Sequence, residues 1–408
     1  MKMAEVGKIT LKEAGEKLGV SYRQAKRIRR AIRDRGMKGL IHGNRGRPSH
    51  RRLSEKLRQK VLSLAKGRYG EFNDTHLTEC LSDQEGIVLS REAVRRLRRG
   101  VGQAPKRRRR APVHRKRRER KAQEGMMVLW DGSPHEWFGP KHPACCLMAA
   151  MDDATGKLLA ARFFPFEGSS GYLWLLRAVV KGYGVPGAMY HDRHGSLHRN
   201  DSHWTLEEEL AGRQEPTQVG LALEGLGIRS IAALSPQAKG RIERLFGVLQ
   251  DRLIAELGQR DIETMEGGNG FLNEFVPRFN RRFAISARES QKAWREVARE
   301  LDLDRLISFR YRSVVGNDNS VRIGGLVLDV PPGPHRRSYA KAKVEVRQRL
   351  DGSWRIYYQD QLIASHPSTE LRDPVRALKH NRRIKGASLD QWVYWASVPS
   401  LEASHGGP

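Results

Sequence analysis

Three acidic residues in the central part of the chain constrain its fold more than any other feature. Asp131 ends an apolar run at 126–130, and Asp192 follows a second apolar run at 187–191. Glu243 opens a pattern in which apolar residues recur at helical spacing. A carboxylate at the end of a strand lies where ligands collect in α/β folds. The order strand, strand, helix therefore predicts an α/β domain in which the three side chains converge.

Three converging carboxylates supply the hard oxygen ligands that Mg²⁺ prefers. Two metal ions about 3.5–4 Å apart can activate an attacking oxygen and stabilise a leaving oxygen at phosphorus. In this arrangement we expect Asp131 to bridge both ions, Asp192 to complete one and Glu243 the other. The residues thus predict a site that cuts and rejoins phosphodiesters with two Mg²⁺ ions, for which Mn²⁺ can substitute.

The charge of the chain narrows the class of partner. Its 408 residues carry a formal net charge of +29 at pH 7. Such an excess gains counterion-release free energy on a polyanion, which favours nucleic acid. On charge alone, a ribosomal or membrane-surface protein stays an alternative. The length predicts about two to four domains.

Cysteine content and hydropathy indicate the compartment. The three cysteines are too few for a disulfide framework or a zinc site: Cys80, Cys145 and Cys146. No apolar stretch is long enough to span a bilayer, and the N-terminus lacks the apolar core of a signal peptide. We expect a soluble protein of the bacterial cytoplasm, associated with the nucleoid.

Residues 1–50 carry a helix-turn-helix pattern with a basic extension. Thr10 and Ser21 can cap two helices, with Gly19 in the turn between them. The second helix would present to DNA the side chains of Arg23, Gln24, Lys26, Arg27 and Arg30. A helical hairpin with a solvated charged face is the alternative. In the Arg-Gly-Arg-Pro extension, Arg45 and Arg47 can enter a narrow minor groove, the alternative being a plain basic linker.

Residues 51–104 are expected to form a second helical DNA-binding domain. Ser90 can cap a helix whose basic face comprises Arg91, Arg95, Arg96, Arg98 and Arg99. Of these, Arg95 and Arg96 are the candidate DNA contacts. The segment 105–124 is dominated by charge and is predicted to be a flexible linker that follows a phosphate backbone.

From residue 125 to 260 the pattern alternates between strands and helices. Strands are expected at 126–131, 144–152, 157–164, 187–191 and 228–232, with helices at 168–181, 218–226 and from Glu243 onward. The turn signal at 152–157 makes the second and third strands a hairpin. Asp152 and Asp153 are rival acids, but aspartate is favoured in such turns for backbone reasons.

The C-terminal part has a different texture. The connector 261–305 contains an expected helical stretch at 271–300. Short strands separated by Gly, Pro and Asp-Gly turns predict a small β-barrel at 306–370. A basic tail, 371–408, follows.

The order of these elements, together with one sequence block, resembles a known family. Asp131, Asp-Arg-His at 192–194 and Ser-Pro-Gln-Ala-Lys-Gly-Arg-Ile-Glu-Arg at 235–244 are similar to the DDE transposases with a retroviral-integrase-type core. The chain most resembles the insertion-sequence group called ISNCY, as far as about residue 290. The expected fold class is multidomain, with N-terminal all-α helix-turn-helix modules, a central α/β RNase H-like core with a mixed sheet, and the C-terminal barrel.

The resemblance implies that Asp131, Asp192 and Glu243 are the catalytic metal ligands. It also implies that activated water nicks double-stranded DNA at terminal inverted repeats, and that the exposed 3′-hydroxyl then attacks target DNA. Two ends must be joined in one event, so a homo-oligomer on DNA is expected. Two features depart from the integrase pattern: a longer gap between Asp192 and Glu243, and Arg193–Ser196 where many integrases carry Asn-Gly.

Neighbours of the triad are candidates for auxiliary roles. Lys239, Arg241 and Arg244 could bind phosphates of the scissile strand, or form a solvated face. His194 could position water or the DNA strand, or stabilise a turn, and Gln237 could contact a base near the cut. Two rival functions stay open: a DNA-binding regulator that has lost the reaction, and an RNase H-like nuclease that cuts without joining.

Overall fold

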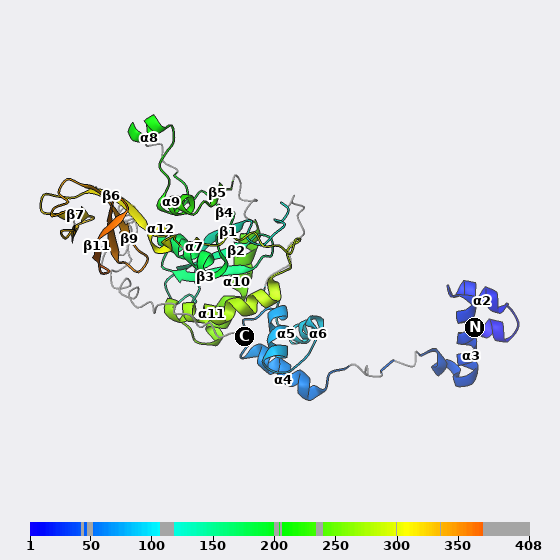
Figure 1. The fold of residues 1–408 in the computed structure, drawn as a ribbon. Helices are drawn as coiled ribbons and strands as arrows, with labels where there is room; N and C mark the ends of the chain where they lie inside the picture. The colour runs from blue at the N-terminus through cyan, green and yellow to red at the C-terminus, as the bar shows by residue number, and fades with distance from the viewer. Residues whose placement is uncertain are drawn as a thin grey trace. The chain divides into compact units, whose positions relative to one another are not determined.

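The computed structural model describes residues 1–41, 45–46, 52–106, 118–199, 204, 206–233, 240–298, 300–334 and 336–369 (Figure 1). The chain divides into two compact units, Met1–Gly70 with Gly86–Gln103, and Glu71–Glu85 with Ala104–Pro408. Residues 71–85, expected in the second helical domain, therefore group with the core. The predictions for Arg47, Gln237, Lys239, the tail 371–408 and the part of the basic linker at 107–117 fall outside the described residues.

In the first unit, α2 (Leu11–Lys17) and α3 (Tyr22–Arg35) begin at the predicted caps. Thr10 forms a capping box with Glu13, and the Ser21 side chain accepts from the Gln24 backbone amide. Gly19 between them has φ +65°, which glycine adopts at little cost. The short helices α1 (Lys2–Glu5) and η1 (Gly36–Leu40) flank the pair. Local sequence signals thus account for this helix pair.

The first unit also contains α4 (Glu55–Lys66) and α6 (Arg91–Gly100), each with a serine cap. The basic face predicted for α6 is incomplete, because Arg98 is buried and its Nε donates to Gln103 Oε1 at 2.9 Å. Gln103 in turn donates to the Ala65 carbonyl of α4 at 3.3 Å. The prediction that Arg98 is exposed is therefore wrong, since a tertiary contact recruits its side chain.

The second unit is built on a five-stranded mixed sheet of order β3–β2–β1–β4–β5. β1 (Val128–His135), β2 (Cys145–Asp152) and β3 (Leu158–Phe164) are antiparallel neighbours. β4 (Ala188–His191) pairs parallel with β1, and β5 (Arg229–Ala232) pairs parallel with β4. The predicted hairpin and mixed sheet are confirmed, and they form the core of this unit.

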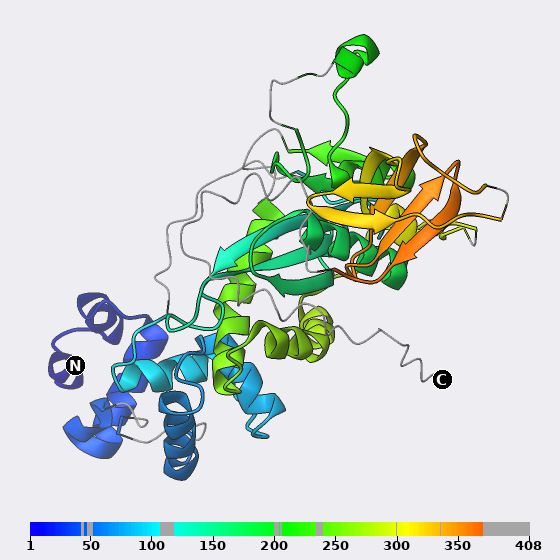
Figure 2. The ribbon, with the colours of Figure 1, turned by 90° about the vertical axis from the view of Figure 1, so that its left-hand side faces the viewer.

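Helices cover both faces of this sheet (Figure 1, Figure 2). α7 (Ser169–Tyr183) and α9 (Gln218–Gly225) share one apolar core with Trp130 and Met189. α10 (Gly240–Gln259) and α11 (Met265–Phe283) share another with Leu129 and Tyr190. Successive strand residues thus point to opposite cores, as the two-residue period of a strand requires. The longer gap between Asp192 and Glu243 includes an insertion after β4 that contains a short helix, α8 (Leu206–Ala211).

A helix from the middle of the predicted second helical domain, α5 (Asp74–Asp83), packs on α10 and α11 through buried polar groups. His76 Nε2 lies 3.1 Å from Glu256 Oε1 on α10. Glu79 pairs with Arg252 of α10 and with Arg282 of α11. Buried charges are costly unless they are paired, so these contacts define one position for α5 on the core.

The connector departs from the predicted helix. α11 ends at Phe283, and the described residues from 284 to 298 contain no helix. Their amides bond to the core instead: Ile285 N donates to the Thr155 carbonyl at 2.9 Å, and Arg295 exchanges two backbone bonds with Val185. The helical prediction for 284–298 is wrong because long-range backbone pairing overrides the periodicity.

The C-terminal region forms an open sheet after the short helix α12 (Leu303–Leu306). β6 (Phe309–Val314), β9 (Lys343–Gln348), β10 (Trp354–Tyr358) and β11 (Gln361–His366) have the order β11–β10–β9–β6. β7 (Ser320–Ile323) and β8 (Leu326–Asp329) pair separately. Val321 and Leu328 of this pair cover the sheet's core. The predicted closed barrel is not found in the described residues.

Helices of the described segments are all too short or too polar to cross a bilayer.

Leu249 tests the packing of α10 on the sheet, because its side chain is fully buried in that core. Leu249→Ala is expected to lower the free energy of unfolding by about 2–5 kcal/mol through lost contacts and a residual cavity. Leu210→Ala on α8 is the matched control, since that side chain is exposed and its loss should change stability by less than about 0.5 kcal/mol. Chemical denaturation followed by circular dichroism measures both values, and equal values would contradict the described packing.

Candidate active site

The register of β1 and β4 brings two of the predicted acids level with each other. Val128 pairs with Met189 and Leu129 with Tyr190, so two residues further on Asp131 stands beside Asp192. Neighbouring strands lie about 4.8 Å apart, so this register directs both acids to the same end of the two strands. Asp192 directly follows β4, as predicted. Asp131 does not end its strand: β1 continues to His135 because its pairing with β2 extends that far.

The third acid is on the helix that covers the same face of the sheet. Leu129 and Tyr190 point into the core that contains Ile242 and Phe246 of α10. Strand alternation gives Asp131 and Asp192 the same side as those two residues. Glu243 lies in the first turn of α10 and is exposed. Within the described residues, no three His, Cys, Asp or Glu side chains are grouped closely enough to hold a metal ion.

The loop after β4 is organised by the backbone of its own turn. The His194 amide donates to Asp192 Oδ1 at 2.9 Å, which fixes that carboxylate against the chain. His191 Nδ1 bonds to the Asp192 carbonyl, so Nδ1 carries the proton and Nε2 accepts from Ser230 Oγ at 2.7 Å. Through this bond the backbone amide of His194 stabilises the turn after β4, one of the two roles predicted for the residue.

Sequence reasoning missed a fourth carboxylate beside these acids. Glu167, just ahead of α7, accepts from the Tyr172 hydroxyl. Its carboxylate packs over the β1 backbone, where a Cβ on Gly132 would lie 2.6 Å from Glu167 Oε2. Burial raises the pKa of Tyr172 well above its usual value, and the charges of Glu167, Asp131 and Asp192 raise it further. Negative potential from three carboxylates thus converges here, a placement that depends on tertiary packing and has no local sequence signal.

Both rival acids lie in the hairpin turn, as the sequence predicts, but only Asp152 bonds within it. Asp152 accepts from the backbone amides of Gly125, at 3.0 Å, and Thr155, at 2.8 Å. Burial raises the pKa of Asp152, and these hydrogen bonds oppose the rise. Asp153 is also buried, and it pairs with Arg118 and with Arg241 of α10.

No family model matches the chain. Its family follows instead from individual proteins that it resembles in sequence. A chain of the simian T-cell lymphotropic virus intasome, with 15% identity and a TM-score of 0.32, covers 75% of this chain and 95% of its own, too loose a superposition to support an argument. The provisionally named transposase y4bF of Sinorhizobium fredii is 33% identical over 88% of this chain and 79% of that protein. The transposase for insertion sequence IS1202 of Streptococcus pneumoniae is 30% identical over 87% of this chain and 82% of that protein.

The chain belongs to the insertion-sequence transposases. The predicted family is thereby confirmed.

The side chains predicted to bind DNA in the first unit of this transposase are solvent-exposed. On α3 they are Arg23, Gln24, Lys26, Arg27 and Arg30. Arg45 is exposed as well. On α6, Arg95 and Arg96 both pair with Glu92, at 2.7 and 3.0 Å, and their hydrogen bonds lower the pKa of Glu92 to about 2.

The two described basic residues near Glu243 differ in accessibility. Arg244 is exposed, and its Nε donates to the Gly240 carbonyl at 2.8 Å. The Arg241 side chain is 13% exposed and is held by Asp153. Arg244 is therefore open to a DNA phosphate, whereas Arg241 is already engaged within the transposase.

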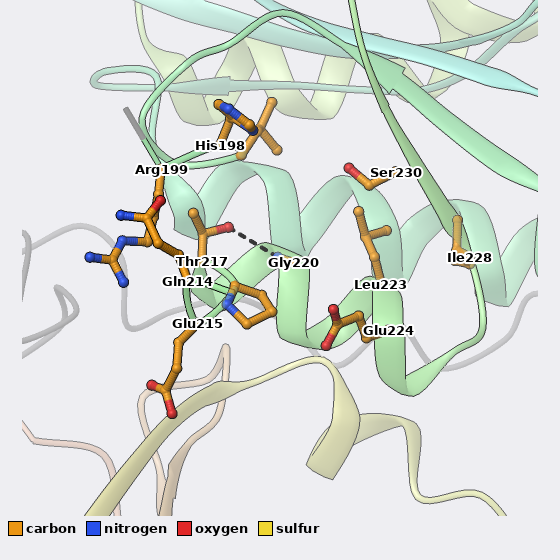
Figure 3. A pocket seen from close by; sticks show the side chains of 12 residues that line it. His198, Arg199, Gln214, Glu215, Thr217, Gly220, Leu223, Glu224, Ile228 and Ser230 are labelled. Atoms are coloured by element: carbon orange, nitrogen blue, oxygen red, sulfur yellow. Dashed lines mark hydrogen bonds between the residues drawn. The ribbon is translucent and has the colours of Figure 1, made fainter. Parts of the chain in front are cut away.

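A cavity of about 340 Å³ lies between the insertion after β4 and α9 (Figure 3). Its lining includes His198, Arg199, Thr217 and Ser230. Ser230 also bonds to His191, the residue before Asp192. The cavity is nonetheless distinct from the acids, since Asp131, Asp192 and Glu243 are not among its lining residues.

Gly132→Ala tests the packing of Glu167 in this transposase. The new Cβ would force the Glu167 carboxylate away and leave the buried Tyr172 hydroxyl without its acceptor, at an expected cost of about 1–3 kcal/mol in unfolding free energy. Gly247→Ala on α10 is the control, since its Cβ would meet nothing within 4 Å and helical propensity favours alanine. Denaturant unfolding gives both values, and an unchanged stability for Gly132→Ala would refute the described contact.

Proposed function

We propose that this transposase binds the ends of an insertion sequence, cuts DNA strands there and joins the ends to target DNA, using Asp131, Asp192 and Glu243 as its catalytic acids. The observation that carries the proposal is the β1–β4 register, which sets Asp131 and Asp192 level on the face covered by α10. The transposase relatives supply the reaction class, polynucleotidyl transfer. The three acids supply the site at which this reaction would take place.

The three acids have the type of ligand atom that divalent metal ions prefer. All three side chains are carboxylates, the hard oxygen ligands that Mg²⁺ prefers. Two bound Mg²⁺ ions, or Mn²⁺ in their place, would activate the attacking oxygen and stabilise the leaving one. In the proposal Asp131, Asp192 and Glu243 together would hold these ions.

The chain's own residues would hold and orient the DNA around these acids. Backbone pairing with β2 fixes Asp131 within β1, and Asp192 directly follows β4, so both carboxylates would meet the DNA strand with little reorganisation. Arg244, exposed one residue after Glu243, would bind a phosphate of the scissile strand. The α3 side chains would read the terminal repeats in the first unit. Joining two ends in one event would require at least two copies of the chain on DNA.

Asp131→Asn and Glu243→Gln test the assignment of the acids. Each change removes a charge from a metal ligand while keeping the shape of the side chain, so strand transfer should fall at least about 100-fold with DNA binding retained. The assay combines labelled end DNA, a target plasmid and Mg²⁺, with binding followed by fluorescence anisotropy. Asp329→Asn on β8 is the control, because it makes the same change outside the core.

The same assay separates the rival functions. Cleavage without joining by the wild type would favour a nuclease, and binding without either reaction would favour a regulator. Full strand transfer by both variants would reject these acids as the catalytic set.

Arg27→Ala tests sequence reading by α3. An exposed arginine on the recognition helix should contribute about 1–3 kcal/mol to specific binding, so affinity for end DNA should fall more than affinity for random DNA. Arg33→Ala, in the last turn of α3 and paired with Asp34, removes the same charge from the same helix. Equal losses from both variants, on both DNAs, would reduce α3 to a nonspecific phosphate contact.

A further inference from the structure

One buried carboxylate joins two segments of the core that are far apart in sequence. Asp153, in the turn between β2 and β3, is fully buried. Its Oδ1 accepts from Arg118 Nη2 and from Arg241 Nη1, each at 2.5 Å. Its Oδ2 accepts from Arg118 Nη1 at 3.1 Å and from the Lys121 backbone amide at 2.8 Å. A turn aspartate needs no such set of partners, so its role extends beyond the hairpin.

The first of these segments is the end of the basic linker. Three residues of the segment 118–121 bind the β2–β3 turn. Arg118 and Lys121 donate to the Asp153 carboxylate, and Arg120 Nη1 donates to the Asp153 carbonyl at 3.0 Å. The Arg118 guanidinium lies 5.7 Å from the centre of the Tyr190 ring, on β4 two residues before Asp192. The docked end of the linker thus contacts the strand that delivers one of the proposed catalytic acids.

The second segment is the first turn of α10. Arg241 lies two positions before Glu243 in that turn, and both of its terminal nitrogens are occupied. Nη1 donates to Asp153 and Nη2 donates to the Arg118 carbonyl. Arg241 therefore fastens the start of α10 to the turn and to the linker end together.

Electrostatics make this attachment strong. Burial alone would raise the pKa of Asp153, but the hydrogen bonds from Arg118 and Lys121 and the charges of Arg118 and Arg241 hold it below its usual value. The carboxylate is therefore ionised at neutral pH. Without it, the guanidinium groups of Arg118 and Arg241 would face each other uncompensated, which disfavours their common docking.

We propose that Asp153 is a positioning residue for Glu243: by holding Arg241 and Arg118 at once, it couples docking of the linker end to the orientation of the first turn of α10. This inference rests on the proposed role of Glu243. It assigns Arg241 to the alignment of the helix, in place of the phosphate contact expected from the sequence. Arg118 becomes a residue through which the linker and the catalytic helix act on each other.

The test separates rate from binding. In single-turnover strand transfer at saturating end DNA, Asp153→Asn should slow the reaction roughly 10- to 100-fold, because small misplacements of catalytic groups have effects of that size. The dissociation constant for end DNA should stay the same or decrease, since the change removes a negative charge beside arginines. Arg241→Gln should slow the reaction similarly with unchanged affinity, and Arg241→Lys, which keeps the charge and one donor, should restore part of the rate.

Hydrogen exchange supplies a readout apart from activity. Arg118→Gln removes a side chain that bonds to Asp153, not to α10 or to an acid of the triad, yet it should decrease the protection of the amides at 244–247, which close the first turn of α10. Arg177→Gln is the matched control, because Arg177 pairs with Asp304 at 3.0 Å, outside this cluster. It should change neither the rate nor the protection of α10. Arg118→Gln and Arg241→Lys keep Asp153 in place, so they decide the matter if Asp153→Asn does not fold.

Two results would overturn the inference. Weaker DNA binding by Arg241→Gln with an unchanged saturated rate would make Arg241 a phosphate contact. Full rate and full α10 protection in Arg118→Gln would show that the linker end and α10 are independent. Failure of the proposed function looks different: Glu243→Gln would then retain strand transfer, or the wild type would show none, whatever the behaviour of the Asp153 cluster.

Discussion

The parallel pairing of β1 with β4 is the interaction on which the candidate site depends. It joins two segments separated by a hairpin and by α7, the crossover helix that packs on the sheet. The same register buries Trp130 and Met189 on one face and Leu129 and Tyr190 on the other. A slip of one residue would send both sets of apolar side chains to the wrong core, so apolar packing is what keeps Asp131 beside Asp192.

Features set by neighbours in sequence were predictable. The caps at Thr10, Ser21 and Ser90 lie where short polar side chains precede helical periodicity. The β2–β3 hairpin follows from a turn rich in Asp and Gly between two apolar runs. The mixed sheet and the transposase family followed from the order of such elements together with the block around Glu243. Each of these depends on physical preferences that act within a few residues.

Features set by distant contacts were not predictable. The exposure expected for Arg98 was lost to Gln103, which is itself held by the Ala65 carbonyl of α4, and the helix expected after Phe283 was replaced by backbone pairing with Val185. Glu167 has no motif of its own, and its place beside Asp131 is visible through the missing Cβ of Gly132. The turn role of Asp153 was foreseen, whereas its two arginine partners come from segments that no local pattern connects to it.

The packing of α5 on α10 has a consequence for the order in which the chain can fold. His76 and Glu256 are separated by 180 residues, so α5 leaves the ribosome long before its partner helix exists. Until then the polar face of α5 has nothing to bury it, and the residues on either side of α5 already belong to the other unit. The core cannot be complete until α10 has been synthesised. Closing so long a loop is also slow, which delays its completion further. A nascent transposase therefore contains its N-terminal helices well before it contains a finished catalytic domain.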